Sequence, residues 1–104
     1  MSEIALPEIA RQLLEEPVLG EADLGAKIRL LLEGEYLRRL RHYRRVDHLL
    51  SQKYGMSFEE FMARQLVRQR GYTWEVEKDA MEWETAISGI QTMEQKLQEL
   101  RALE

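Results

Sequence analysis

Residues 36–55 read YLRRLRHYRRVDHLLSQKYG and decide the fold. Within this stretch, side chains spaced alternately four and three residues apart form one stripe: Tyr36, Leu40, Tyr43, Asp47, Leu50 and Tyr54. This spacing places them along one side of an α-helix, so it predicts a seam that packs against a second helix. Gly55 suits the left-handed position that follows a helix end. The stretch therefore predicts the second half of a long basic helix over residues 21–55.

A second apolar stripe follows closer to the C-terminus, with the same spacing of three and four residues. Its members are Ala80, Trp83, Ile87, Ile90, Met93, Leu97 and Leu100. They predict a long, one-sided, acidic helix over residues 73–103, with Thr73 as its N-cap. Because each long helix has one apolar side, we expect the two to pack as an antiparallel hairpin.

Shorter elements complete the predicted fold. Ser57 and Glu60 have the spacing of a capping box, which predicts a short capped helix over residues 57–70. Pro7 suits the first turn of a short N-terminal helix, which we place with its following turn in residues 1–20. The prediction is an all-α protein with a single helical domain over residues 1–104.

The charges are distributed unevenly along the chain. Residues 38–70 carry nine Lys or Arg against three acids, a net charge of +6. Residues 1–37 and residues 71–104 each carry three basic and eight acidic residues, a net charge of −5 in each case. This layout suits a basic centre that meets either an external polyanion or acidic arms, belonging to this chain or to a partner.

The basic residues of the long helix form a face rather than only a cluster in the sequence. Arg38, Arg41, Arg44 and Arg45 are its candidates, together with His42 and His48. Two interpretations have equal weight: a solvated face paired with acids, or a surface for a protein partner. Nucleic-acid binding ranks behind both, because the tyrosines that would stack on bases lie on the opposite, core-facing stripe.

Groups with catalytic chemistry are sparse. The chain has no cysteine, and His42 and His48 match no common metal-binding spacing, so we expect both to face solvent. The acids of residues 75–84 fit a solvated face or a surface for arginines better than a catalytic pair. We predict that the protein is not an enzyme and has no catalytic residue, metal or cofactor. No apolar stretch approaches a membrane span, and we expect a cytoplasmic protein.

The start of the C-terminal helix is the predicted partner-binding surface. Trp74 is the candidate aromatic anchor, because Trp is enriched among the residues that dominate binding energy. The surface comprises Trp74, Glu75, Glu77, Glu82 and Glu84. The competing interpretation, which has the greater weight, is that Tyr72 and Trp74 pack against the helix of Phe58 and Phe61.

The sequence also resembles a known class of protein. Residues 53–61 read KYGMSFEEF; LGAKIRLLLE precedes them at residues 24–33, and EWE follows at residues 82–84. This order resembles small helical bacterial proteins that look like the antitoxin member of type II toxin–antitoxin pairs, over roughly residues 24–100. The resemblance implies a cognate toxin partner, often a ribonuclease, held by the helices, and no catalytic residues.

Three hypotheses about function result. The first is a non-enzymatic, antitoxin-like protein whose acidic C-terminal helix covers a basic, RNA-binding toxin surface; it is also a possible homodimer. The second is a homo-oligomeric helical scaffold. The third is nucleic-acid binding through the face of Arg38 to Arg45.

Overall fold

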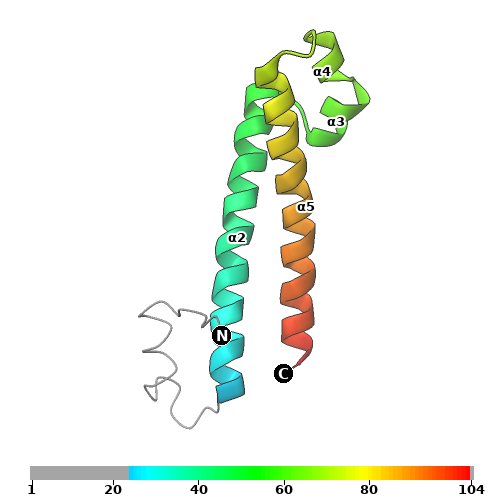
Figure 1. Ribbon diagram of the computed structural model, residues 1–104. Helices are drawn as coiled ribbons and strands as arrows, with labels where there is room; N and C mark the ends of the chain where they lie inside the picture. Colours follow the sequence, from blue (N-terminus) through cyan, green and yellow to red (C-terminus); the bar gives the residue numbers. More distant parts are fainter. Residues whose placement is uncertain (1–23, 104) are drawn as a thin grey trace, which may run out of the picture. The chain divides into compact units, whose positions relative to one another are not determined.

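The computed structural model describes residues 24–103, and this part of the chain is all-α, as predicted (Figure 1). Its helices are α2 (Leu24–Tyr54), α3 (Phe58–Ala63), α4 (Leu66–Gln69) and α5 (Trp74–Ala102). The two long helices match the predicted ranges to within a few residues. The helix predicted within residues 1–20 lies outside the described residues. No helix within residues 24–103 combines the length and the apolar character that crossing a membrane requires.

The chain divides into two units, Met1–Glu35 and Tyr36–Glu104. The boundary falls within α2. The part of α2 from Tyr36 onward and the whole of α5 belong to the second unit, which therefore contains the helical hairpin.

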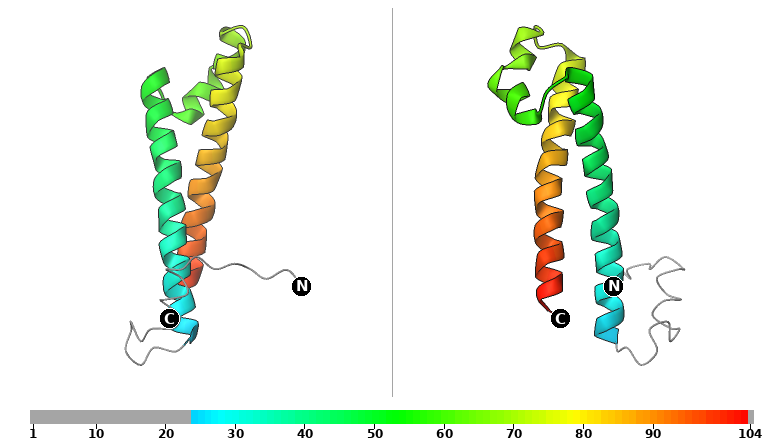
Figure 2. Two further views of the ribbon diagram at one scale, coloured as in Figure 1. Left: turned by 60° about the vertical axis from the view of Figure 1, so that its left-hand side comes forward. Right: turned by 180° about the vertical axis from the view of Figure 1, so that it is seen from behind.

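Within the second unit, α2 and α5 run antiparallel, as predicted. The ammonium group of Lys96 lies 5.9 Å from the centre of the Tyr36 ring. Further along α2, the Trp83 indole N–H donates to Asp47 Oδ1 at 2.8 Å. Rising residue numbers on α2 thus meet falling numbers on α5, and Figure 2 shows the helices side by side from two more directions.

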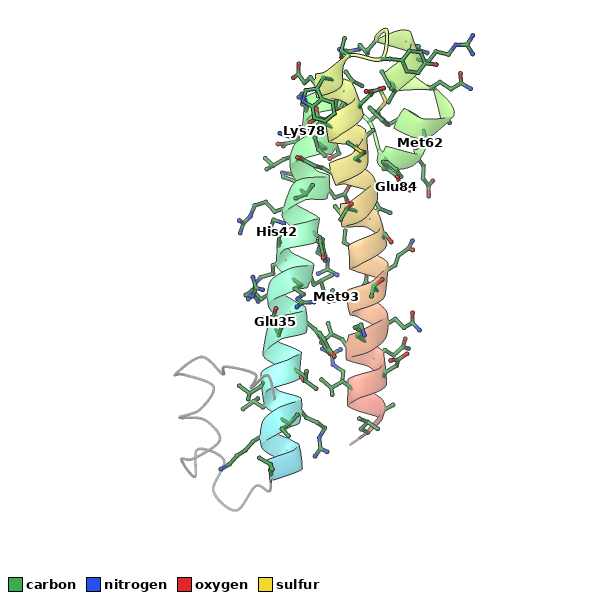
Figure 3. All side chains as sticks on the ribbon, viewed as in Figure 1. Glu35, His42, Met62, Lys78, Glu84 and Met93 are labelled. Carbon is green, nitrogen blue, oxygen red and sulfur yellow. The ribbon has the colours of Figure 1, made fainter. Side chains whose placement is uncertain are left out.

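The predicted stripes form the core. At the end of the hairpin where α2 ends and α5 begins, the buried cluster comprises Leu50, Tyr54, Phe61, Leu66, Val76 and Trp83. Nearer the other end of α5, a second cluster comprises Leu40, Met93 and Leu97. Figure 3 labels Met93 between the two long helices. Tyr36 and Tyr43 pack against the second cluster, so the prediction that the aromatic stripe is core is confirmed.

Local sequence signals set the helix ends. Gly55 has a φ of +67°, in the left-handed region. The N–H of Met56 donates to Ser51 O at 3.2 Å, and α2 ends here. Ser57 Oγ accepts from the Glu60 N–H at 3.2 Å, and Thr73 Oγ1 accepts from the Val76 N–H at 3.4 Å. Both predicted N-caps are therefore confirmed. The Glu60 carboxylate lies 3.6 Å from the Arg64 guanidinium rather than completing a capping box.

The prediction of one helix over residues 57–70 is wrong, because α3 and α4 are separate. Gln65 has a φ of 52°, in the left-handed region, which stops α3 after Ala63. Its carbonyl then accepts from the Gln69 N–H at 3.0 Å and begins α4. The break turns the chain, so Phe61 and Leu66 both reach the core cluster.

Gly89 of α5 lies close to the Tyr43 ring of α2. A Cβ atom at this position would lie 2.5 Å from carbon atoms of the Tyr43 ring. We expect Gly89→Ala to lower the free energy of unfolding by about 1–3 kcal/mol, because overpacking outweighs the helix-propensity gain of about 1 kcal/mol. Urea denaturation followed by circular dichroism measures the change.

Gly34→Ala is the matched control for this prediction. Gly34 also lies inside a long helix, but no atom lies within 4 Å of a Cβ added there. We expect it to stabilise the protein by about 0.5–1 kcal/mol. Equal stabilisation by both variants would show that Tyr43 does not restrict Gly89.

Candidate functional site

A polar network joins the end of α2 to the beginning of α5. Asp79 Oδ2 accepts from the Tyr54 hydroxyl and from the Lys53 ammonium, each at 2.6 Å. The same ammonium donates to Glu75 Oε1 at 2.8 Å. Asp79 and Tyr54 are buried, whereas Lys53 and Glu75 are exposed. The sequence analysis placed Asp79 in a solvated acidic cluster; the structure corrects this, because the carboxylate is a buried acceptor.

The network shifts the pKa values of its members. Burial acts to raise the pKa of Asp79, but hydrogen bonds from Lys53 and Tyr54 outweigh it and hold this pKa below its usual value. Burial and the hydrogen bond to Asp79 raise the pKa of Tyr54 to about 12. Hydrogen bonds to Asp79 and Glu75 raise the pKa of Lys53. At neutral pH the network therefore holds an ionised Asp79 and a neutral Tyr54.

The raised pKa of Tyr54 predicts a loss of stability in alkali. The ordinary pKa of a tyrosine is 10.0 and that of folded Tyr54 is about 12, so the unfolded chain loses this proton first. The stability contribution is complete below pH 10 and is lost as the pH rises toward 12. Spectrophotometric titration should show a tyrosinate component near pH 12 that is absent from Tyr54→Phe. The prediction would be contradicted if the wild type differed from the variant only by one additional tyrosine that titrates with an ordinary pKa.

Trp83 is the centre of an aromatic cluster beside this network. Its ring centre lies 5.9 Å from that of Tyr54, 5.5 Å from Phe58 and 5.1 Å from Phe61. Its indole N–H is satisfied by Asp47, which explains a carboxylate on an otherwise apolar stripe. Trp83 is fully buried, as its place on the predicted stripe implied.

Trp74, the predicted anchor, lies on the surface as the first residue of α5 and is 70% exposed. Tyr72 just before it is 60% exposed. Both residues are therefore mostly exposed, although Tyr72 lines a groove together with Phe61 of α3. The structure brings together, at one end of the hairpin, two large exposed aromatic residues and the capped start of an acidic helix.

The predicted acidic residues occupy several positions around α5. Glu75 pairs with Lys53 at 2.8 Å, and the Glu82 carboxylate lies 3.9 Å from the Lys78 ammonium. Glu77 is half-buried, and Glu84, labelled in Figure 3, is exposed. The residues thus do not form one flat patch. Glu75 adjoins Trp74, and Glu82 and Glu84 lie about two and about two and a half turns beyond Glu75.

The predicted basic face lies on the outer part of α2. Arg38, Arg41, Arg44 and Arg45 are all exposed, as are His42 and His48. Within residues 24–103, no carboxylate lies within ion-pair distance of Arg41, Arg44 or Arg45. The prediction of solvent-facing histidines is confirmed. In this part of the chain, no three His, Asp or Glu side chains converge as metal ligands.

The sequence analysis missed a groove formed by the short helices. It has a volume of about 400 Å³ and lies between α3, α4 and Tyr72. Met62, labelled in Figure 3, lines it and is 54% exposed. The isolated apolar residues gave no signal for a groove, because it arises from the unexpected break at Gln65.

Comparisons with protein-family models, with curated proteins and with solved structures find no match.

Proposed function

We propose that this protein is a non-enzymatic binding protein that holds another protein through α5, as the antitoxin-like partner of a toxin. The observation that carries the proposal is the exposure of Trp74 at the first position of a helix capped by Thr73. An exposed tryptophan is a typical anchor of a protein–protein interface. The resemblance of residues 24–100 to antitoxin-like proteins supplies the class of partner.

The charges of α5 support the same proposal. Glu75 follows Trp74 directly, and the exposed Glu82 and Glu84 lie further along the same helix. These carboxylates suit a basic protein surface such as that of an RNA-binding toxin. The Trp74 side chain and the nearby carboxylates together favour helix-in-groove contact, in which a groove on the partner protein covers the start of α5.

The test is co-expression with the product of the adjacent gene. We expect the product to be toxic alone, to be neutralised by this protein, and to co-purify with it. Trp74→Ala should weaken the complex at least tenfold, measured by calorimetry, because truncation of such an anchor costs about 2 kcal/mol or more. Met81→Ala is the matched control, since Met81 is an exposed apolar residue elsewhere on α5. An adjacent product that is harmless alone and does not co-purify contradicts the proposal.

The arginine face supports a second candidate function, nucleic-acid binding. Arg41, Arg44 and Arg45 are exposed and have no ion-pair partner within residues 24–103. Binding of this kind weakens steeply as salt rises, because phosphate contacts release counterions. Absence of binding to duplex or single-stranded oligonucleotides at low salt removes this candidate.

A further inference from the structure

The groove beside Tyr72 combines an apolar lining with one basic side chain. Phe61 and Leu66, both buried, form part of its lining, and Val67, Met62 and Tyr72 add further apolar surface. Arg68 is the charged side chain that lines it. Its volume of about 400 Å³ lies within the roughly 300–1,000 Å³ typical of ligand sites. The groove therefore has room for a large apolar side chain.

Two residues with left-handed backbone frame the groove. Gln65 has a φ of 52° and Tyr72 has a φ of 56°, although neither is glycine. Tyr72 is held in this conformation by a hydrogen bond from its N–H to Val67 O at 2.8 Å. Its side chain is 60% exposed, so core burial does not offset the unfavourable backbone. Strain at an exposed aromatic residue is characteristic of a binding surface.

The charge of this segment selects the kind of ligand. Residues 61–72 contain Arg64, Arg68 and Arg70 and no acid. Arg64 pairs with Glu60, and the Arg70 guanidinium lies 5.8 Å from the centre of the Tyr54 ring. Arg68 is exposed and contacts Gln65 Oε1 at 3.4 Å, and no carboxylate within residues 24–103 pairs with it. A ligand carboxylate would give it an ion-pair partner.

We propose that this groove binds an acidic amphipathic segment of a partner protein. One leucine, methionine or phenylalanine of the segment fills the groove, and a carboxylate about one turn away pairs with Arg68. This inference rests on the proposed function in that it assumes a protein partner, and it assigns the partner a second contact. The contact has the opposite charge to α5, so the partner presents a basic surface to α5 and an acidic segment to the groove.

The test uses two synthetic peptides and the full chain. The acidic peptide is a twelve-residue helix former with leucines on one face and glutamates beside them, and the basic peptide has lysines in place of the glutamates. Titration of isotope-labelled protein, followed by nuclear magnetic resonance, measures affinity and locates the contact. We expect amide shifts at Met62, Val67, Arg68 and Tyr72, and at least tenfold tighter binding of the acidic peptide.

Two variants separate binding from folding. Tyr72→Gly removes one wall of the groove, so it should weaken binding of the acidic peptide at least tenfold. It also removes the backbone strain at residue 72, so it should raise Tm by roughly 2–6 °C. Arg68→Glu should reverse the preference between the peptides. Trp74→Ala, outside the groove lining, should leave peptide affinity unchanged.

Equal binding of both peptides, no binding at millimolar concentration, or shifts away from the groove would overturn the inference. None of these results affects the co-expression test of α5. Conversely, loss of the toxin complex in Trp74→Ala with unchanged peptide binding supports the two contacts as separate.

Discussion

Replacement of Trp83 by alanine should lower the free energy of unfolding by about 3–5 kcal/mol, as expected for truncation of a buried Trp. Trp83 is fully buried and contacts the rings of Tyr54, Phe58 and Phe61. The variant also leaves the Asp47 carboxylate without its indole donor. Because small domains have a total stability of only about 5–15 kcal/mol, the variant should lose a large share of its stability.

The other tryptophan is the matched control for this prediction. Trp74→Ala removes the same side chain from a position that is 70% exposed, so its effect should stay within about 0.5 kcal/mol. Circular dichroism in urea reports both variants without relying on tryptophan fluorescence. If Trp83→Ala does not fold, Trp83→Phe takes its place. This variant keeps an aromatic ring but lacks the N–H donor, so it should give an intermediate loss of stability. Similar effects at residues 74 and 83 would contradict the assigned core.

Asp79→Ala should give the second large effect, a loss of about 2–3 kcal/mol. The buried Tyr54 hydroxyl then has no acceptor, and an unsatisfied buried group costs about 1–3 kcal/mol in addition to the lost charged hydrogen bond. The Lys53 contact adds less, because its ammonium is exposed to solvent and screened. Glu75→Ala, which removes only the exposed acceptor of Lys53, should cost much less.

The effect of Asp79 should depend on pH in a defined direction. Its pKa in the folded chain lies below the ordinary aspartate value of 3.8, so the folded state holds the proton less tightly than the unfolded state. The stability contribution is present above pH 3.8 and is lost as the pH falls through the folded pKa. The difference between wild type and Asp79→Ala should therefore shrink below about pH 4. A difference that grows in acid would refute the proposed charge state.

A double-mutant cycle isolates the bond between Tyr54 and Asp79. Tyr54→Phe should cost stability in the wild-type background but little in Asp79→Ala, where the hydroxyl has already lost its acceptor. The coupling free energy should be about 1–2 kcal/mol, within the range for residues in direct contact. Additive losses would show that the two groups do not interact.

The hairpin could be predicted because its signal is periodic. The spacing of Leu40, Leu50 and Tyr54 on one helix, and of Met93 and Leu97 on the other, reports burial directly. The caps at Ser57 and Thr73 were predictable for a similar reason, since they depend on contacts within one turn. Local chemistry and helical periodicity thus account for most of the described fold.

The remaining features of the structure depend on tertiary contacts, which the residue types alone do not reveal. Asp79 resembled its acidic neighbours, and the available cue was its place four residues before Trp83 on the core side. Gln65 gave no cue at all, because glutamine is not a residue type associated with left-handed turns. The break at Gln65 creates the groove, so the groove could not be predicted from the sequence either.

The polar bonds between α2 and α5 also fix the register of the hairpin. An apolar seam alone would accept a slip of one helix along the other by one turn, about 5.4 Å. Such a slip would place Ile87 or Asp79 opposite Asp47, in place of the Trp83 indole that donates to it. With Ile87 opposite, the Asp47 carboxylate would lie against an apolar side chain. With Asp79 opposite, two carboxylates would lie together. The hydrogen bonds of Asp47 and Asp79 therefore distinguish one alignment from its near-equivalent neighbours.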